Sequence, residues 1–419
     1  MKYAVITFGC RVNQADSLGF EEELRAAGAT AAPAESADLV VVNTCSVTAT
    51  ADQGARQTIR RVARDNPSAR IVVTGCYATR RSDEIMAHPN VVRVVPNDDK
   101  PRLLTIVREM TTAERFGQGD GACGASIEPG VAGRTAFTLR VQTGCAEPCS
   151  YCIIPATRGM PRSVPIADVL REISRATAAG FKEITITGVH LGSYGRDLDR
   201  RASLSELLSR AKALADHHDL LFRISSLEPM DCSREIVDLI AASDRFAPHF
   251  HLPLQHASNR ILFAMRRPYT IEFYASLVDD IRSKVPTASI GSDIIVGFPG
   301  ETGDDFDRLA SYLERSPLTH IHVFPYSDRP GTEASTMSGK VPGAIVRERG
   351  RRVREIGERL TTRFRDSQIG TAHRALTLED GSLVVTGNYL KLRVPPAYPR
   401  NQWVRVRVMS HHHGELLGG

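Results

Sequence analysis

The 419-residue sequence has no run of about 18 apolar residues, the length that a membrane-spanning helix requires. Its first apolar segment, Tyr3 to Phe8, is short and soon followed by Arg11, unlike a secretory signal. An excess of one charge is also missing, because 53 basic residues face 48 acidic ones. We therefore expect a cytoplasmic protein without membrane association, long enough for two or three domains.

Cysteine is sparse, with eight residues in the chain. Because the cytoplasm keeps thiols reduced, these cysteines argue against a disulfide scaffold and leave metal binding or catalysis. Cys123 and Cys232 have no partner at ligand spacing and are interpreted as non-ligands. The three histidines at 411–413 are interpreted as a solvated tail. The other six cysteines form two sets of three.

The first 110 residues alternate short apolar runs with helical patterns, which predicts a parallel sheet covered on both faces. The expected strands are 3–8, 38–43, 70–74 and 91–95, and the expected helices are approximately 16–27 and 50–65. Residues 117–133 contain six glycines and no apolar periodicity, so they are interpreted as a linker.

Strand and helix alternate again after the linker, and six βα units predict a barrel or partial barrel. The expected strands are 137–142, 183–187, 220–225, 249–254, 289–296 and 320–325. A long amphipathic helix is expected at 344–365. Alternation in 403–409 then predicts a small C-terminal β-barrel. The α/β chain is thus divided into domains 1–116, 134–366 and 367–419.

The strongest chemical signal is GCAEPCSYCIIP, which places Cys145, Cys149 and Cys152 just after the first strand of the second domain. Three thiolates can hold three irons of a [4Fe-4S] cluster and leave the fourth iron open. The carboxyl ends of barrel strands are also where active sites form. A zinc site with a distant fourth ligand, or three unrelated buried cysteines, is the alternative.

A second set consists of Cys10, Cys45 and Cys76, each at the end of an apolar run, in TFGC, VNTC and VTGC. In a parallel sheet the strand ends share one edge, and neighbouring strands lie about 4.8 Å apart. The three thiols can therefore converge on one object, again with one iron left open. Three small buried residues at strand ends would give the same pattern.

The first array, with Tyr151 before its last cysteine, resembles the radical S-adenosylmethionine (radical SAM) enzymes. Two such arrays and a C-terminal β-domain resemble the methylthiotransferases, which replace a C–H bond by C–S–CH3. The resemblance covers nearly the whole chain, through FGCRVNQADS, VNTCSVTATAD, VTGCYA, TGVHLGSYG, SSLEP, DIIVGFPGET and FPYSDRPGT. The segment TGNYLKLRV is similar to the RNA-binding TRAM domain.

Within this family, GCRVNQ (9–14) and TGVHLGSYG (187–195) are similar to the branch that acts on N6-threonylcarbamoyladenosine beside the tRNA anticodon. In contrast, His256-Ala257 in PLQHAS is similar to the branch that modifies an aspartate of a ribosomal protein. The isopentenyladenosine branch usually differs at both of the first two motifs. Two motifs against one favour the threonylcarbamoyl substrate.

The resemblance implies two [4Fe-4S] clusters and SAM as cofactors. It implies that the set of Cys145, Cys149 and Cys152 makes the 5′-deoxyadenosyl radical, and that the set of Cys10, Cys45 and Cys76 holds the sulfur. It also implies tRNA and an external electron donor as partners, and the sulfur source is unknown. The residues that the resemblance assigns to SAM contacts are Tyr151, Gly188, Ser225, Ser226 and Gly297; glycines and serines at strand ends are equally ordinary turn residues.

The segment 340–366 carries nine basic and four acidic residues and thus accounts for the whole net charge of +5. Such a helix face is usually only solvated, but next to a TRAM-like barrel it suits an RNA backbone. The predicted RNA contacts are Arg351, Arg352, Arg354, Arg374, Lys391, Arg393, Arg405 and Arg407. The competing class is an iron-sulfur RNA-binding or electron-carrying protein, but a carrier needs no open iron, and both arrays stop at three cysteines.

Overall fold

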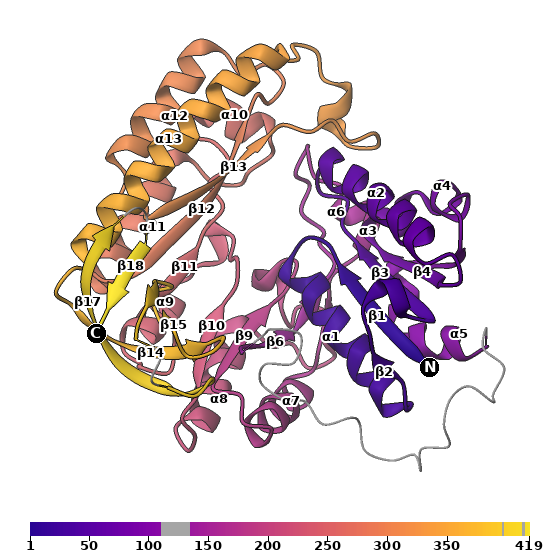
Figure 1. Ribbon diagram of the computed structural model, residues 1–419. Helices are drawn as coiled ribbons and strands as arrows, with labels where there is room; N and C mark the ends of the chain where they lie inside the picture. Colours follow the sequence, from indigo (N-terminus) through magenta and orange to yellow (C-terminus); the bar gives the residue numbers. More distant parts are fainter. Residues whose placement is uncertain (110–134, 396–397, 413–414) are drawn as a thin grey trace.

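The computed structural model describes residues 1–109, 135–395, 398–412 and 415–419. It has an N-terminal sheet, an arc of six parallel strands and a small C-terminal barrel (Figure 1). This order agrees with the α/β fold class that the sequence predicts. The predicted linker and Cys123 lie outside the described residues, and the exact domain limits stay predictions.

The N-terminal sheet is parallel throughout, in the order β2-β1-β3-β4-β5. Its side chains alternate between two cores: Val40 and Val42 pack toward α2, whereas Val41 packs toward α1. Helix α1 begins at Arg11, before the predicted start at residue 16. The elements are β1 (Lys2–Thr7), α1 (Arg11–Ala26), β2 (Thr30–Ala31), β3 (Leu39–Thr44), α2 (Ala49–Asp65), β4 (Arg70–Gly75), α3 (Cys76–Arg80), α4 (Ser82–Met86), β5 (Val91–Val95) and α5 (Leu103–Glu109).

The central domain contains the six predicted parallel strands as two three-stranded sheets, β6-β9-β10 and β11-β12-β13. A single parallel bridge between Phe222 and Phe246 joins the sheets into an open arc. The strands are β6 (Phe137–Arg140), β9 (Glu183–Thr187), β10 (Leu221–Ile224), β11 (His249–His251), β12 (Ser289–Val296) and β13 (His320–Pro325), and the short strands β7 (Gln142–Thr143) and β8 (Arg162–Ser163) form a separate pair.

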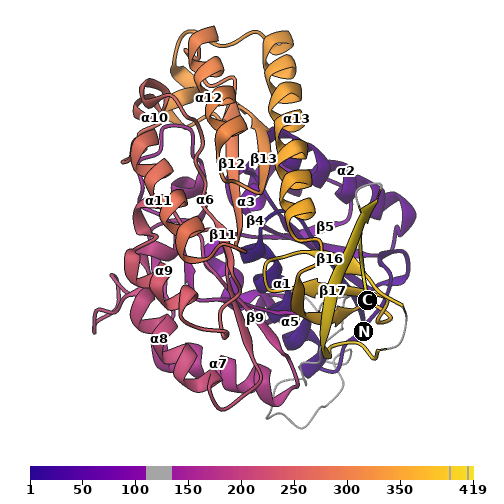
Figure 2. The ribbon, with the colours of Figure 1, turned by 90° about the vertical axis from the view of Figure 1, so that its left-hand side faces the viewer.

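Helices cover the outer face of the arc (Figure 2). Ile184, Ile186 and Phe222 point into this outer core, so the intervening Thr185 and Arg223 lie on the inner face. The helices are α6 (Ile154–Arg158), α7 (Ile166–Ala178), α8 (Leu204–Ala215), α9 (Arg234–Ala241), α10 (Asn259–Ala264), α11 (Ile271–Lys284) and α12 (Gly303–Arg315). The polar inner face is therefore the side that is available for an active site.

Helix α13 (Gly343–Ser367) packs against β13 and leads into a closed five-stranded barrel, as predicted. In the described part of the chain, no helix is both long and apolar enough to cross a membrane. The predicted histidine tail is wrong at its start, because His411 belongs to β17 and contacts Asp366. The barrel strands are β14 (Ala372–Leu378), β15 (Leu383–Thr386), β16 (Lys391–Arg393), β17 (Trp403–His412) and β18 (Glu415–Gly418).

Candidate active site

The first cysteine set lies at the carboxyl edge of the N-terminal sheet. Cys10 follows β1, Cys45 follows β3 and Cys76 follows β4, and these three strands are neighbours. All three side chains are free thiols. Burial is the main reason why the pKa of Cys45 is raised to about 11, and nearby Cys10 and Cys76 contribute to the rise. The structure thus brings together the three residues that the strand-end pattern predicts.

Gly9 makes room for this set. Its φ of +86° lies in the left-handed region that favours glycine. A Cβ at this position would lie 2.6 Å from the Sγ of Cys45, which is closer than non-bonded atoms allow. The residue before Cys10 therefore has to be glycine for Cys10 and Cys45 to be neighbours.

The second set occupies the loop between β7 and α6. The backbone N–H of Cys145 donates to Gly159 O, and that of Glu147 donates to Cys145 Sγ at 3.4 Å. Burial raises the pKa of Cys152 to about 12. A buried thiol with a raised pKa binds metal only when the metal or a nearby cation offsets the thiolate charge.

Two buried arginines supply such cations, one at each set. Arg267 Nη1 lies 3.2 Å from Cys149 Sγ, and Arg158 hydrogen-bonds to Cys76. Burial lowers the pKa of Arg158, but Cys76, Asp16 and Cys10 together more than offset this and raise it. Sequence reasoning missed both arginines, because Arg267 lies 118 positions from the cysteine that it contacts.

Helix α6 connects the two cysteine sets. It begins at Ile154, two residues after Cys152, and ends at Arg158, which contacts Cys76. A helix of this length rises about 7.5 Å. The two sets therefore lie on either side of one short helix.

The spacing of the thiols favours a cluster over a single ion. Tetrahedral zinc with Zn–S bonds of about 2.3 Å would hold sulfurs about 3.8 Å apart. Within residues that the structure describes, no three cysteines bring their sulfur atoms within 4.8 Å of one another. Three separated thiols per set instead suit separate irons of a polynuclear group. Cys232 is buried and belongs to no such group among the described residues.

The residues assigned to SAM share the strand-end edge with Cys145. Gly188 follows β9, Ser225 and Ser226 follow β10, and Gly297 follows β12. Ser225 Oγ donates to Thr187 Oγ1 at 3.1 Å. The Gly297 N–H donates to Glu301 Oε2 at 2.7 Å. These positions remain a prediction as SAM contacts.

Tyr151 packs against the small apolar cluster that includes Ile261, Met265 and Phe298. Burial raises the pKa of the Tyr151 phenol well above its ordinary value, so this phenol stays neutral. Its role beside the second cysteine set is therefore to present an apolar ring. A contact of this ring with SAM remains a prediction.

His190 was not predicted as a site residue, although it lies in the TGVHLGSYG motif. Its Nε2 lies 2.7 Å from Asp231 Oδ2, and its ring also hydrogen-bonds to Cys145. Burial lowers the pKa of His190, but the contacts with Asp231 and Cys145 raise it to about 9. His190 thus places a third positive charge beside the cysteines.

The inner face of the second sheet carries a group of two histidines and one carboxylate. Asp293 Oδ1 lies 3.0 Å from His251 Nε2 and 3.2 Å from His322 Nδ1. Burial raises the pKa of Asp293, but its hydrogen bonds with both histidines hold it well below the ordinary value. This wall therefore keeps a negative charge at its centre.

His256 belongs to the one motif that conflicts with the other two. It is fully buried, and its Nδ1 accepts a hydrogen bond from the Ser258 N–H at 2.9 Å. Burial lowers its pKa to about 3, so the ring is neutral. Ala257 is buried as well. His256 and Ala257 are therefore packed inside the domain, where His256 Nε2 lies 3.8 Å from Glu301 Oε2.

The predicted RNA-binding residues are exposed but differ in their partners. Four are in ion pairs: Arg351 with Glu348 and Glu355, Arg352 with Asp307, Arg374 with Asp219, and Arg393 with Glu415. Among the carboxylates that the structure describes, none forms an ion pair with the other four, which are Arg354, Lys391, Arg405 and Arg407. The second group is therefore the better candidate for phosphate contacts.

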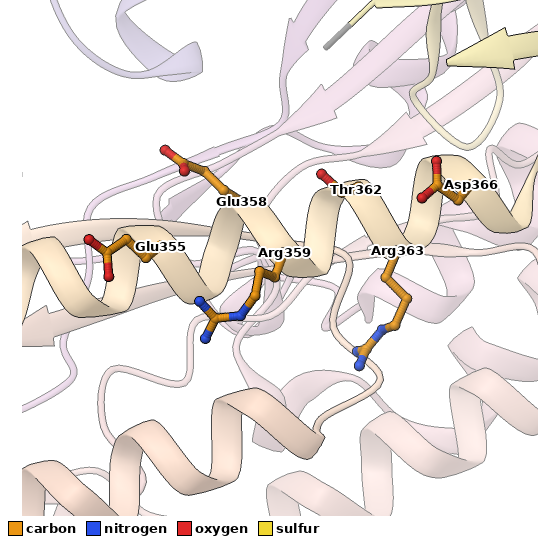
Figure 3. A pocket seen from close by; sticks show the side chains of 6 residues that line it. All are labelled: Glu355, Glu358, Arg359, Thr362, Arg363 and Asp366. Atoms are coloured by element: carbon orange, nitrogen blue, oxygen red, sulfur yellow. The ribbon is translucent and has the colours of Figure 1, made fainter. Parts of the chain in front are cut away.

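The hollow in Figure 3 runs along the C-terminal half of α13. Its charged lining consists of Glu355, Glu358 and Asp366 against Arg359 and Arg363. Acidic side chains outnumber basic ones here, so this half of the helix does not provide a basic groove for RNA. It also contributes no cysteine to the sites above.

Comparison with known proteins agrees with this geometry. Residues 2–96 match the family model described as uncharacterized protein family UPF0004, and residues 139–313 match the radical SAM superfamily. The solved radical SAM methyltransferase TsrM from Kitasatospora setae has the same fold, with a TM-score of 0.56 and 16% identity over 80% of this chain and 77% of that chain. The match over residues 139–313 identifies a radical SAM domain in this chain, and the fold agrees with it.

Relatives in sequence narrow the family further. The threonylcarbamoyladenosine tRNA methylthiotransferase MtaB of Aquifex aeolicus is 37% identical over 94% of this chain and 96% of its own length. The MtaB of Bacillus subtilis is 35% identical over 85% and 80%. A tRNA-2-methylthio-N(6)-dimethylallyladenosine synthase of Carboxydothermus hydrogenoformans is 33% identical over 89% and 87%. The chain belongs to the radical SAM methylthiotransferase family.

Proposed function

We propose that this protein methylthiolates C2 of N6-threonylcarbamoyladenosine beside the tRNA anticodon, using SAM and two [4Fe-4S] clusters. The observation that carries the proposal is the pair of three-thiol sets on either side of α6. A reaction that removes one hydrogen and inserts one sulfur needs two such sites near one substrate atom. When bound, these groups supply the radical that takes the C2 hydrogen and the sulfur that replaces it.

The chain's own residues hold and insulate these sites. Cys145, Cys149 and Cys152 would hold the cluster that binds SAM, and Arg267 neutralises the charge at Cys149. The set of Cys10, Cys45 and Cys76 would hold the other cluster. Cys45 and Cys76 are buried, which limits the access of water and oxygen to them, whereas Cys10 is exposed and the cysteines of the other set are partly buried.

Arg158 belongs to a buried network between the sites. It hydrogen-bonds to Cys76, and its Nη2 lies 3.7 Å from Asp16 Oδ2. Lys100 Nζ also contacts Asp16 at 2.7 Å. This buried network joins α1 and α6 between the two cysteine sets. It therefore supports transfer between two neighbouring sites.

The threonylcarbamoyl substrate is supported by two kinds of observation. The names of the relatives in Aquifex aeolicus and Bacillus subtilis state this substrate. The motifs GCRVNQ (9–14) and TGVHLGSYG (187–195) also favour this substrate, whereas the buried His256-Ala257 pair is the one motif that is similar to the ribosomal-protein branch. tRNA would approach the C-terminal barrel. Its exposed basic side chains that form no ion pair with a described carboxylate are Lys391, Arg405 and Arg407. The proposed domains are 1–116, 134–366 and 367–419, in a cytoplasmic enzyme that takes electrons from an external donor.

Mass spectrometry of tRNA nucleosides and ribosomal proteins from a strain that lacks this protein tests the proposal. We expect the 2-methylthio form of threonylcarbamoyladenosine to disappear and the unmethylthiolated form to accumulate. Loss of a methylthio group from a ribosomal protein or from isopentenyladenosine would show that the protein acts on the substrate of another branch of the family. Unchanged nucleosides and proteins would favour an electron carrier.

A further inference from the structure

Arg11 stands apart from the other residues of the GCRVNQADS motif. Val12, Asn13 and Asp16 are buried, and Asn13 donates to Phe8 O and Thr44 O, each at 2.9 Å. Cys10 belongs to a cysteine set. Asn13 and Asp16 also contact Arg158 and Arg140 at the start of the central domain, whereas the half-buried Arg11 extends toward the inner face of the strand arc.

The guanidinium of Arg11 lies at the inner face of the strand arc. Its Nη1 donates to Thr185 Oγ1 at 3.4 Å, and its Nη2 donates to Tyr389 OH at 3.2 Å. Thr185 comes from β9, and Tyr389 comes from the turn between β15 and β16 of the C-terminal barrel. Residues of three domains thus meet around one side chain.

Arg11 lacks a counter-charge. No carboxylate of the described chain lies within ion-pair distance of it, whereas the neighbouring Arg223 is paired with Glu183 at 2.8 Å. An arginine has five N–H donors, and the contacts above use two of them. The remaining donors form a fork that suits a carboxylate of a ligand.

We propose that Arg11 binds the carboxylate of the threonylcarbamoyl group and thereby selects this nucleoside. The inference rests on the proposed function and names the residue behind its substrate choice. The threonine part of the substrate keeps its carboxylate, which loses water when the base enters the protein and then needs a cation.

The position of Arg11 also fits the reaction. It follows Cys10 directly, so a substrate anchored on Arg11 is held beside the sulfur-bearing set. Tyr389 restrains the guanidinium, and the Tyr389 ring lies 4.6 Å from the Arg223 guanidinium. A neutral dimethylallyl substituent would leave Arg11 buried without an anion, which costs free energy and disfavours that substrate.

The test compares two anticodon stem-loop RNAs, one with threonylcarbamoyladenosine and one with its neutral threoninamide analogue. For the wild type we expect kcat/KM to be about 10- to 100-fold higher for the carboxylate RNA. Arg11→Gln should remove this preference, and Arg11→Lys should keep part of it. Arg64→Gln, an exposed pair partner of Asp65 on α2, is the matched control and should behave as wild type.

Two further measurements distinguish a failure of the Arg11 proposal from a failure of the proposed function. Iron content and SAM cleavage without RNA should be normal in Arg11→Gln, which shows that the variant is folded and loaded. The affinities of wild type and Arg11→Gln for both RNAs show the carboxylate preference without requiring turnover. Equal preference in wild type and Arg11→Gln overturns the role of Arg11. A wild type that binds the carboxylate RNA better but never methylthiolates it overturns the proposed function instead.

Discussion

At the scale of single residues, Gly9 is a sharp test of the Cys10, Cys45 and Cys76 set. Gly9→Ala forces a left-handed residue to carry a Cβ, which costs about 1–2 kcal/mol, and displaces Cys45. We expect about half of the iron to be lost while SAM cleavage continues. Gly19→Ala on α1, where a Cβ meets no atom within 4 Å, is the matched control. Full iron content in Gly9→Ala would show that Cys45 is not a ligand.

The two cysteine sets should fail independently. Cys149→Ala should abolish reductive SAM cleavage and leave about half of the iron, because the other set belongs to another domain. Cys45→Ala should cleave SAM but give no methylthiolated nucleoside. Iron analysis and 5′-deoxyadenosine assays of anaerobically reconstituted protein measure both. Normal 5′-deoxyadenosine production by Cys149→Ala would contradict the assignment.

The histidines beside Asp293 give a prediction about pH. The hydrogen bond with Asp293 raises the pKa of His322 above its ordinary value, whereas burial and the neighbouring His251 and His322 lower that of His320 to about 4. A raised histidine pKa stabilises the fold below the ordinary value, and the stabilisation is lost as pH rises through the folded value. NMR titration should find His322 above 6.5, and Asp293→Asn should lower it.

If the His322 pKa is the same in wild type and Asp293→Asn, the contact between these two side chains does not persist in solution. The His320 signal is an internal reference, because its shift comes mainly from burial. It should stay below the ordinary histidine value in both proteins.

At the scale of secondary structure, the sequence predicts best where a pattern is local. The six central strands and α13 lie at the predicted positions because their apolar periodicity is strong. The start of α1 was missed because its first turn carries Asn13, which is polar in sequence but buried in the structure. Tertiary hydrogen bonds, rather than apolar spacing, extend that helix to Arg11.

The residues of the candidate site also divide into those that a local sequence pattern predicts and those that it does not. The two sets of three cysteines could be proposed as cluster ligands because their spacing or their strand-end position is visible in the sequence. Arg267, Arg158 and His190 could not be proposed, because each acts on a cysteine from a distant segment. A basic or imidazole side chain near a thiol can be identified only once the fold brings the segments together.

At the scale of the whole molecule, contacts between domains converge on the active site. Arg329, in the loop after β13, pairs with Asp52 of α2 at 2.7 Å. Arg223 of β10 donates to Gly387 O in the C-terminal barrel at 2.9 Å. Together with the Arg11 contacts, these bonds hold the N-terminal sheet and the C-terminal barrel against the same arc of strands. A tRNA held by the barrel would therefore have a fixed position relative to both cysteine sets.

The ion pairs predict which basic residues bind tRNA. Changing Lys391, Arg405 and Arg407 to Gln should reduce the slope of log affinity against log salt by about 2–3, because each lost phosphate contact releases fewer counterions. Changing the ion-paired Arg351, Arg352 and Arg393 to Gln removes the same charge. These side chains already have carboxylate partners, so we expect the slope to change by less than about 1.

Titration of tRNA binding at several salt concentrations distinguishes the two triple variants. SAM cleavage without tRNA should stay normal in both variants, because none of the changed basic residues contacts the cysteines. An equal loss of slope in the two variants would mean that α13 and the barrel share the phosphate surface. A loss confined to the ion-paired variant would transfer tRNA binding to α13, and the Arg351 side chain would then have to exchange Glu348 and Glu355 for phosphates when tRNA binds.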